Sequence, residues 1–121
     1  MNIGIIGKGF VGTAISEGFK TQGHETICHD VRLETNIRDV LHTPITYICV
    51  PTPSAPNGDC DTSIVENTVM ELDNLALTRQ CSNRIVVIKS TIPPGTTEKL
   101  NEECKHIQVV FNPEFLTEAN F

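Results

Sequence analysis

The glycines near the start of the chain carry the clearest chemical signal. A G-x-G-x-x-G motif is formed by Gly7, Lys8, Gly9, Phe10, Val11 and Gly12. It directly follows a short apolar run and opens a segment with helical periodicity, which is the context a dinucleotide-binding turn requires. We expect Gly7 to permit a tight turn, Gly9 to let a pyrophosphate approach the backbone, and Gly12 to let the helix pack on the strand. Free N–H groups and the positive end of the helix dipole would then hold the phosphates.

An acidic residue lies at the expected distance from this motif. Asp30 ends the second predicted strand, about 20 residues after the glycines, where a carboxylate accepts hydrogen bonds from the adenosine ribose. A carboxylate there repels a 2′-phosphate, so Asp30 favours NAD over NADP, and Arg32 nearby weakens that preference. Without the glycine motif, Asp30 would be interpreted as a solvated loop acid. Lys8 is interpreted more simply as a solvated lysine than as a phosphate ligand.

The cysteines and histidines do not form a site of their own. The five cysteines are far apart, and no two have the C-x-x-C spacing of a metal or redox pair. The four histidines lack the H-x-x-x-H spacing of a metal site, so we expect no bound metal. An odd number of cysteines without a signal peptide favours reduced thiols in a cytoplasmic protein.

The hydrophobic pattern places the candidate residues on alternating strands and helices. Short apolar runs predict strands at residues 3–6, 26–29, 45–50, 85–88 and 107–111. Segments with helical spacing separate most of these runs, and residues 37–41 predict only a short helix. This alternation predicts a doubly wound parallel α/β sheet, a Rossmann fold, of about five strands. Ligands bind such sheets at the carboxyl ends of the strands.

Size and charge limit the classes of function. The 121 residues correspond to a single domain, spanning residues 1–121. The net charge of −6 disfavours a nucleic-acid partner and an anionic membrane surface, which would need a basic stripe. No apolar run approaches the roughly 20 residues that span a bilayer.

Three further motifs close the third, fourth and fifth predicted strands. Residues 47–53 read Tyr-Ile-Cys-Val-Pro-Thr-Pro, residues 89–97 read Lys-Ser-Thr-Ile-Pro-Pro-Gly-Thr-Thr, and residues 112–118 read Asn-Pro-Glu-Phe-Leu-Thr-Glu. Together with the glycine motif, they resemble the N-terminal NAD-binding domain of the UDP-glucose/GDP-mannose dehydrogenase family. The resemblance runs in order along nearly the whole chain.

The resemblance implies an NAD-dependent oxidation of the primary alcohol of a nucleotide sugar to a carboxylate. Two hydrides leave in succession. Family members hold the aldehyde on a cysteine, first as a thiohemiacetal and then as a thioester that water hydrolyses.

The resemblance also implies roles for residues in the matching motifs. Residues 7–12 and Asp30 would hold the ADP half of NAD. The remaining cofactor contacts would come from Val50, Pro51, Thr52, Pro53, Ser54, Ser90, Thr91, Ile92 and Glu118. Thr91 and Glu114 would position the hydrolytic water, with Glu114 as the general base. The substrate would contact Glu114, Phe115, Leu116, Thr117 and Glu118.

The residues taken alone leave simpler interpretations open. Thr91 could cap the turn before Pro93 and Pro94, and Glu114 and Glu118 could be surface acids. The prolines could simply terminate strands, since proline cannot extend a central ladder.

The chain departs from the family pattern in three places. Only sixteen residues separate Asp30 from Tyr47, where the family has a long insertion that supplies a basic residue to the NAD phosphates. Thr117 and Ala119 differ from the residues that are usual at those positions. The catalytic cysteine of the family and its partners lie beyond Phe121, so we expect this chain alone not to complete the oxidation.

Two other functions remain open. The chain could be a non-catalytic NAD-binding or regulatory module, or a dehydrogenase of another Rossmann group. The latter is disfavoured, because the three strand-end motifs would then be accidental. In the leading interpretation the substrate is a small-molecule nucleotide sugar. The partner is then a separate substrate-domain chain or the remainder of a longer product, and association into an oligomer stays open.

Overall fold

The computed structural model describes residues 2–7, 9–30, 35–53, 56–58, 61–78 and 84–112. The strands in these ranges are β1 (Asn2–Ile6), β2 (Glu25–His29), β3 (Ile45–Ile48), β4 (Arg84–Ile88) and β5 (Ile107–Phe111). The helices are α1 (Phe10–Thr21), the 3-10 helix η1 (Ile37–His42), α2 (Ser63–Thr78) and α3 (Thr96–Glu103). The predicted alternation is confirmed. The third strand ends two residues before the apolar run does, because the chain leaves the sheet before its proline-rich loop.

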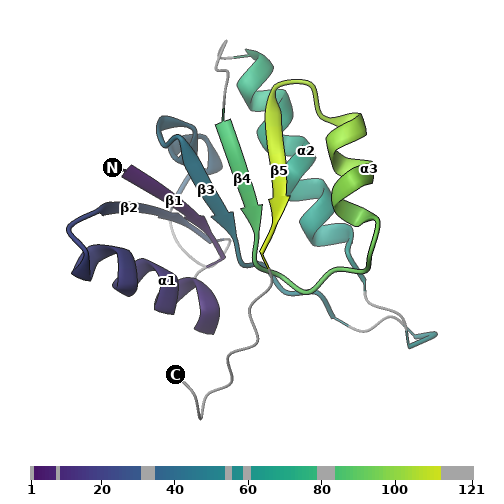
Figure 1. Cartoon of the computed structure of the whole chain (residues 1–121), viewed down its shortest axis with the longest axis horizontal. Coiled ribbons are helices and arrows are strands. Elements are labelled where there is room, and N and C mark those ends of the chain that lie inside the picture. The colour runs from purple at the N-terminus through teal and green to yellow at the C-terminus, as the bar shows by residue number, and fades with distance from the viewer. Residues whose placement is uncertain are drawn as a thin grey trace.

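The strands form one parallel sheet in the order β2-β1-β3-β4-β5 (Figure 1). The chain moves from β1 to β2 on one side and then crosses to β3 on the other side of β1. The order of the strands therefore reverses at β1, and such a switch point opens a crevice at the carboxyl ends of the strands. The predicted doubly wound Rossmann fold is confirmed.

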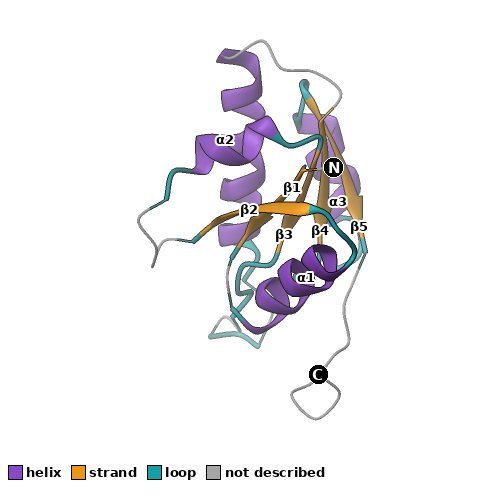
Figure 2. Ribbon diagram, turned by 90° about the vertical axis from the view of Figure 1, so that its left-hand side faces the viewer, coloured by secondary structure: helices purple, strands orange, loops and turns teal. Residues whose placement is uncertain are grey.

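Helices cover the two faces of the sheet unequally. α1 lies on one face, and α2 and α3 lie on the other (Figure 2). The main core lies on the second face, where α2 buries a stripe at helical spacing made of Val65, Val69, Leu72 and Ala76. Against it pack the strand residues Ile6, Ile48, Val86, Ile88, Ile107 and Val109. Each such side chain contributes about 1.5–3 kcal/mol by leaving water.

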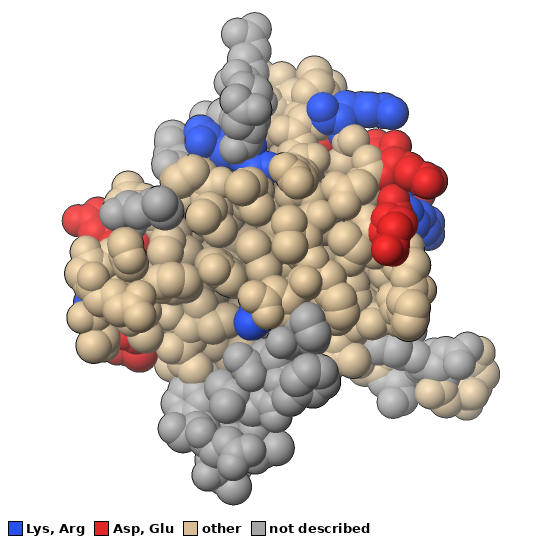
Figure 3. All heavy atoms as spheres, viewed as in Figure 1, with Lys and Arg blue, Asp and Glu red and all other residues tan. Residues whose placement is uncertain are grey.

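The face of the sheet that carries α1 is only partly covered. α1 packs over β1 and β2, where the Ser16 and Thr26 hydroxyls lie 3.0 Å apart. Farther along this face, Ile85 and Val110 are 36% and 39% exposed. Figure 3 shows few charged side chains in the middle of this view and most of them at its rim.

Polar side chains fasten the last helix and strand to the core. The buried Asp73 carboxylate of α2 accepts the N–H groups of Lys105 and His106 at 3.0 and 2.8 Å. The Asn101 amide donates to the Val109 carbonyl at 2.8 Å and accepts the Val109 N–H at 2.9 Å.

None of the described helices combines the length and apolar composition needed to cross a membrane.

Candidate functional site

The turn after β1 can only be made by glycine at position 7. Gly7 has a φ of +94°, in the left-handed region that disfavours side chains. A Cβ at this position would lie 2.6 Å from the Cys49 carbonyl oxygen, because the turn passes directly over the end of β3. The Gly7 N–H donates to the His29 carbonyl at 2.8 Å, which joins the turn to β2.

Gly12 lets the first helix pack against this turn. A Cβ on Gly12 would collide with the Gly7 carbonyl oxygen and lie 3.4 Å from Cγ2 of Ile5. α1 therefore begins directly above the turn and β1, as the sequence predicts.

Gly9 faces open space at the start of α1. A Cβ there would meet no atom within 4 Å, and its φ of −82° is one that any residue adopts. The first turn of α1 contains no acidic residue, and Gly9, which precedes the helix, has no side chain that could cap it. The first N–H groups of a helix have no partner within the helix and carry partial positive charge. This end of α1 is therefore suited to an anion.

Asp30 lies beside the glycine turn at the end of β2. It is buried, with 7% of its surface exposed, and its N–H donates to the Thr35 hydroxyl at 3.3 Å. The same hydroxyl lies 2.8 Å from Nδ1 of His29. Because Gly7 bonds to the carbonyl of His29, the backbone holds Asp30 and the turn next to each other.

One cavity of about 410 Å³ is lined by both Gly7 and Asp30. Its other lining residues are Ile6, His29, Ile37, Val50, Pro51, Ile64, Thr68 and Glu71. The volume is within the range of about 300–1,000 Å³ usual for small-molecule sites. Gly7, Asp30, Val50 and Pro51 were predicted from the sequence, whereas Ile37 of η1 and the three residues of α2 were not.

The end of β4 positions the proline-rich loop. The Ser90 hydroxyl donates to the Val50 carbonyl at 2.6 Å, and Ser90 is 8% exposed. Ser90 thus holds the loop whose residues Val50 and Pro51 line the cavity. Thr52 is half-buried, and the exposed Pro53 accepts the Asp61 N–H through its carbonyl at 2.7 Å.

Other predicted site residues lie elsewhere. The Ile92 side chain is buried in the core, Thr91 is exposed at the end of β4, and neither lines the cavity of Gly7 and Asp30. The predicted residues outside the described ranges are Lys8, Ser54, Glu114, Phe115, Leu116, Thr117 and Glu118. Their roles, and that of Thr91, stay predictions.

Two cysteines have thiols that resist ionisation. Burial raises the pKa of the Cys49 thiol from 9.0 to about 12, and the nearby Lys89 offsets only part of this effect. Burial, assisted by Asp73 and Glu103, raises the pKa of Cys104 to about 11. Since the thiolate is the nucleophile, both are poor nucleophiles at neutral pH.

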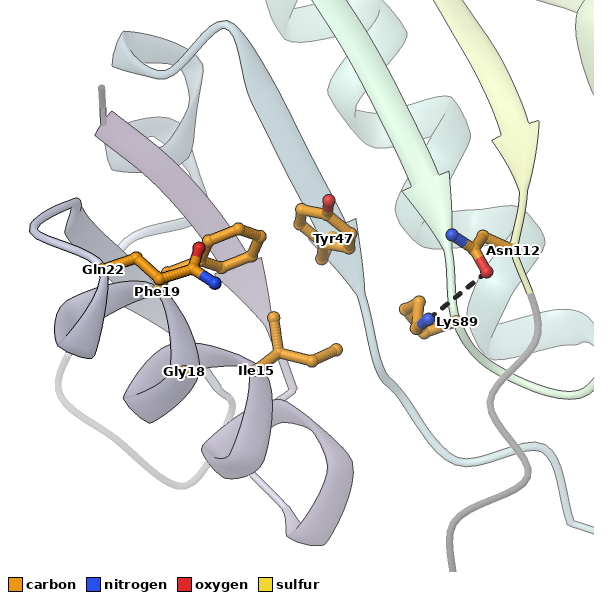
Figure 4. A pocket seen from close by; sticks show the side chains of 7 residues that line it. All are labelled: Ile15, Gly18, Phe19, Gln22, Tyr47, Lys89 and Asn112. Carbon is orange, nitrogen blue, oxygen red and sulfur yellow. Dashed lines mark hydrogen bonds between the residues drawn. The ribbon is translucent and has the colours of Figure 1, made fainter.

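A second hollow, of about 270 Å³, lies between α1 and the neighbouring strands (Figure 4). The Phe19 and Tyr47 rings meet there with centroids 5.4 Å apart. Lys89 Nζ donates to Asn112 Oδ1 at 3.5 Å, which brings the starts of two strand-end motifs together. The two hollows share no described lining residue.

A family model agrees with this architecture. The model for the NAD binding domain of the UDP-glucose/GDP-mannose dehydrogenase family matches residues 31–121. The chain belongs to this family. The match begins directly after Asp30, so it is independent of the glycine motif.

Relatives in the family extend the match over the whole chain. The chain is 26% identical to the putative UDP-glucose 6-dehydrogenase YtcA of Bacillus subtilis over 158 residues, which cover 99% of this chain and 36% of YtcA. It is 38% identical to the GDP-mannose 6-dehydrogenase of Pseudomonas aeruginosa over 90 residues, 66% of this chain and 20% of that protein. Since 99% of 121 residues is about 120, about 38 positions of the YtcA alignment have no counterpart here. The chain is therefore shorter than YtcA within the aligned region.

Solved structures of family members have the same fold. A GDP-mannose dehydrogenase from Pseudomonas aeruginosa, solved as a ternary complex, superimposes with a TM-score of 0.84 and 27% identity over 98% of this chain. A UDP-glucose dehydrogenase from the archaeon Pyrobaculum islandicum gives a TM-score of 0.83 and 27% identity over 97%. The chain spans 37% and 36% of those chains, so it corresponds to about a third of a family member.

Proposed function

We propose that this domain binds NAD in the cavity lined by Gly7 and Asp30, as the cofactor-binding part of a nucleotide-sugar dehydrogenase. The observation that carries the proposal is that one cavity joins the glycine turn to a buried carboxylate. The pyrophosphate would lie at the start of α1, where Gly9 leaves room and the N–H groups attract an anion. Asp30 would accept hydrogen bonds from the adenosine ribose.

The same cavity favours NAD over NADP. The carboxylate of Asp30 would repel a 2′-phosphate, and a second acid, Glu71, lines the same cavity. No Lys or Arg is among the described residues that line it, so no described cation there would neutralise that phosphate.

The proposed reaction of the complete enzyme is the oxidation of a sugar primary alcohol to a carboxylate. NAD supplies the hydride acceptor, one molecule for each of two successive oxidations, and water supplies the second oxygen. We assign Thr91 and Glu114 to this water, with Glu114 as the general base, and Glu114–Glu118 to the substrate. The names of the relatives, UDP-glucose and GDP-mannose 6-dehydrogenases, support a nucleotide sugar as the substrate class. The nucleophile and most sugar contacts would come from outside this chain.

Calorimetric titration of the purified chain with NAD and with NADP tests the cofactor assignment. We expect saturable binding of NAD and much weaker binding of NADP. At 100 times its dissociation constant, NAD would stabilise the domain by about 2.7 kcal/mol, which a thermal shift would detect. Absence of both binding and thermal shift would refute the proposal.

A turnover assay tests the reaction. NADH formation is followed with UDP-glucose, UDP-N-acetylmannosamine or GDP-mannose, for the chain alone and with a supplied substrate-domain half from a relative. We expect turnover only in the mixture. NAD binding without turnover in any mixture would favour a non-catalytic NAD-binding module instead.

A further inference from the structure

We propose that Glu71, assisted by Thr68, selects the base of the bound dinucleotide by accepting a hydrogen bond from its exocyclic amino group. These two residues of α2 would then determine specificity for adenine. The inference rests on the proposed function, because it assumes that the dinucleotide occupies the cavity of Gly7 and Asp30.

The chemistry of the ribose directs the base toward α2. The phosphate, the base and the two hydroxyls are attached to different carbons of the sugar, and Asp30 is proposed to accept hydrogen bonds from the hydroxyls. With the phosphates at the glycine turn and the hydroxyls at the end of β2, the base is left to the remaining walls of the cavity. The remaining walls are formed by Ile6, Ile37, Val50, Pro51, Ile64, Thr68 and Glu71, and of these only Thr68 and Glu71, both on α2, have polar side chains.

Apolar side chains on these walls suit the faces of a flat ring. Ile37 is half-buried on η1, and Ile64 is 40% exposed at the start of α2. An isoleucine that is exposed at the wall of a cavity gains from being covered, since burying apolar surface is favourable. A purine ring packed against Ile64 would provide that cover.

The polar groups on the α2 wall are all hydrogen-bond acceptors. The Thr68 hydroxyl donates its proton to the Ile64 carbonyl at 2.7 Å, so its oxygen can only accept from a ligand. An ionised Glu71 carboxylate can also only accept. The described part of the chain provides no hydrogen-bond or ion-pair partner for Glu71. The other polar side chains of the cavity, His29 and Asp30, lie at the end of β2, where the ribose is placed.

Such a wall distinguishes an amino group from a carbonyl. Adenine presents an exocyclic amino group, which donates, whereas hypoxanthine presents a carbonyl oxygen at the same ring position, which accepts. The hypoxanthine oxygen facing the Glu71 carboxylate would be repelled and left without its hydrogen bond, and the adjacent N1–H of hypoxanthine would meet the carboxylate only after the ring moved from the position of adenine. A hydrogen bond to a charged group corresponds to about a tenfold difference in affinity or more.

Titrations with NAD and with nicotinamide hypoxanthine dinucleotide test this inference on the whole chain. We expect the unaltered protein to bind NAD about tenfold more tightly than the hypoxanthine analogue. Glu71→Gln should bring the two dissociation constants to within about threefold, because its amide can turn a donor toward the carbonyl. The ratio of the two dissociation constants is the informative quantity. Loss of one negative charge changes the electrostatic attraction of the protein to the pyrophosphate equally in both dinucleotides.

Glu102→Gln is the matched control. Glu102 of α3 is exposed, as Glu71 is, but it does not line the cavity, so its variant has the same charge change and should keep the tenfold ratio. Equal binding of both dinucleotides by the unaltered protein, or an unchanged ratio in Glu71→Gln, would overturn this inference and leave NAD binding intact. Failure of NAD itself to bind would overturn the proposed function and this inference with it.

Discussion

The Ser90 hydroxyl donates a 2.6 Å hydrogen bond to the carbonyl oxygen of Val50. The two residues are 40 positions apart in the chain, and their bond ties the end of β4 to the loop after β3. Because Ser90 is 8% exposed, water cannot readily replace it as the partner of that carbonyl. Val50 and Pro51 therefore keep a defined position at the wall of the cofactor cavity.

Ser90→Ala should lower both the stability of the domain and its affinity for NAD. Removing the donor leaves the Val50 carbonyl without its partner, which costs about 1–3 kcal/mol of unfolding free energy. We expect the dissociation constant for NAD to rise severalfold, because the loop is no longer held. Urea denaturation and calorimetric titration measure the two effects.

Thr21→Ala is the control for this change. Its hydroxyl donates to the Glu17 carbonyl at 2.9 Å at the exposed end of α1, so a bond of the same kind is lost where water can replace it. We expect a smaller loss of stability and no change in NAD affinity. An unchanged affinity in Ser90→Ala as well would argue against the positioning role of Ser90.

Gly7→Ala and Gly9→Ala should separate folding from binding. Alanine at position 7 would have to adopt a φ of +94° and place its Cβ against the Cys49 carbonyl, so we expect a loss of about 1–3 kcal/mol of stability. Alanine at position 9 fits the backbone and meets no atom, yet its methyl group would project where the pyrophosphate is proposed to lie. Gly9→Ala should therefore keep the melting temperature and weaken NAD binding at least tenfold.

Gly18→Ala provides the comparison for these two variants. Gly18 lies farther along α1, a Cβ there meets nothing within 4 Å, and it does not line the cavity of Gly7 and Asp30. We expect slightly higher stability, by roughly 1 kcal/mol, since alanine favours a helix over glycine. Tight NAD binding by Gly9→Ala would place the pyrophosphate elsewhere.

Cys49 and Cys104 should react slowly with iodoacetamide. Their thiols have pKa values of about 12 and 11, so at pH 8 each is almost entirely protonated. Compared with an unperturbed cysteine of pKa 9.0, we expect alkylation of the folded chain to be about a hundredfold slower at Cys104 and slower still at Cys49, in line with the difference in thiolate fraction. The rate should rise about tenfold per pH unit up to the raised pKa, as long as the fold persists.

Peptide mass spectrometry follows each cysteine separately, and alkylation in denaturant provides the control. Unfolding should remove the protection of both residues, because burial is its main cause. Rapid labelling of Cys104 in the folded chain at pH 8 would show that burial does not raise its pKa.

The sequence predicts the parts of this site whose chemistry is local. The tight turn at Gly7, the close packing at Gly12 and the acid at the end of β2 each depend on a few neighbouring residues. The α2 wall could not be predicted in this way. Ile64, Thr68 and Glu71 follow helical spacing, but so does the adjacent stripe that packs in the core. Which side of a helix meets a cavity depends on where η1 and β2 end, and those positions are set by tertiary packing.

The start of α2 shows the same limit. Ser63 and Glu66 have the S-x-x-E spacing of a capping box. In the structure Ser63 is already the first helical residue, and the Asp61 carboxylate accepts its N–H at 2.9 Å. The Glu66 carboxylate accepts the Thr62 hydroxyl at 2.9 Å and also pairs with Lys99 of α3 at 2.9 Å, 33 positions away. Local spacing predicts the start of the helix, but Ser63 is not its cap, and the ion pair of Glu66 depends on another helix, which local spacing does not reveal.

Asp30→Asn should reduce the preference of the domain for NAD over NADP. The carboxylate is expected to bind the ribose hydroxyls and to repel a 2′-phosphate, and the neutral amide does both less well. Hydrogen bonds to charged groups are worth about 1.5–3 kcal/mol, so NAD binding should weaken tenfold or more while NADP binding stays the same or improves. The preference for NAD, expressed as the ratio of the two dissociation constants measured by calorimetry, should fall at least tenfold.

Asp39→Asn is the control. Asp39 is an exposed acid of η1 that does not line the cavity, so this variant should leave the ratio unchanged. If Asp30→Asn keeps the original ratio, the ribose is bound by another group and the orientation proposed for the dinucleotide is wrong.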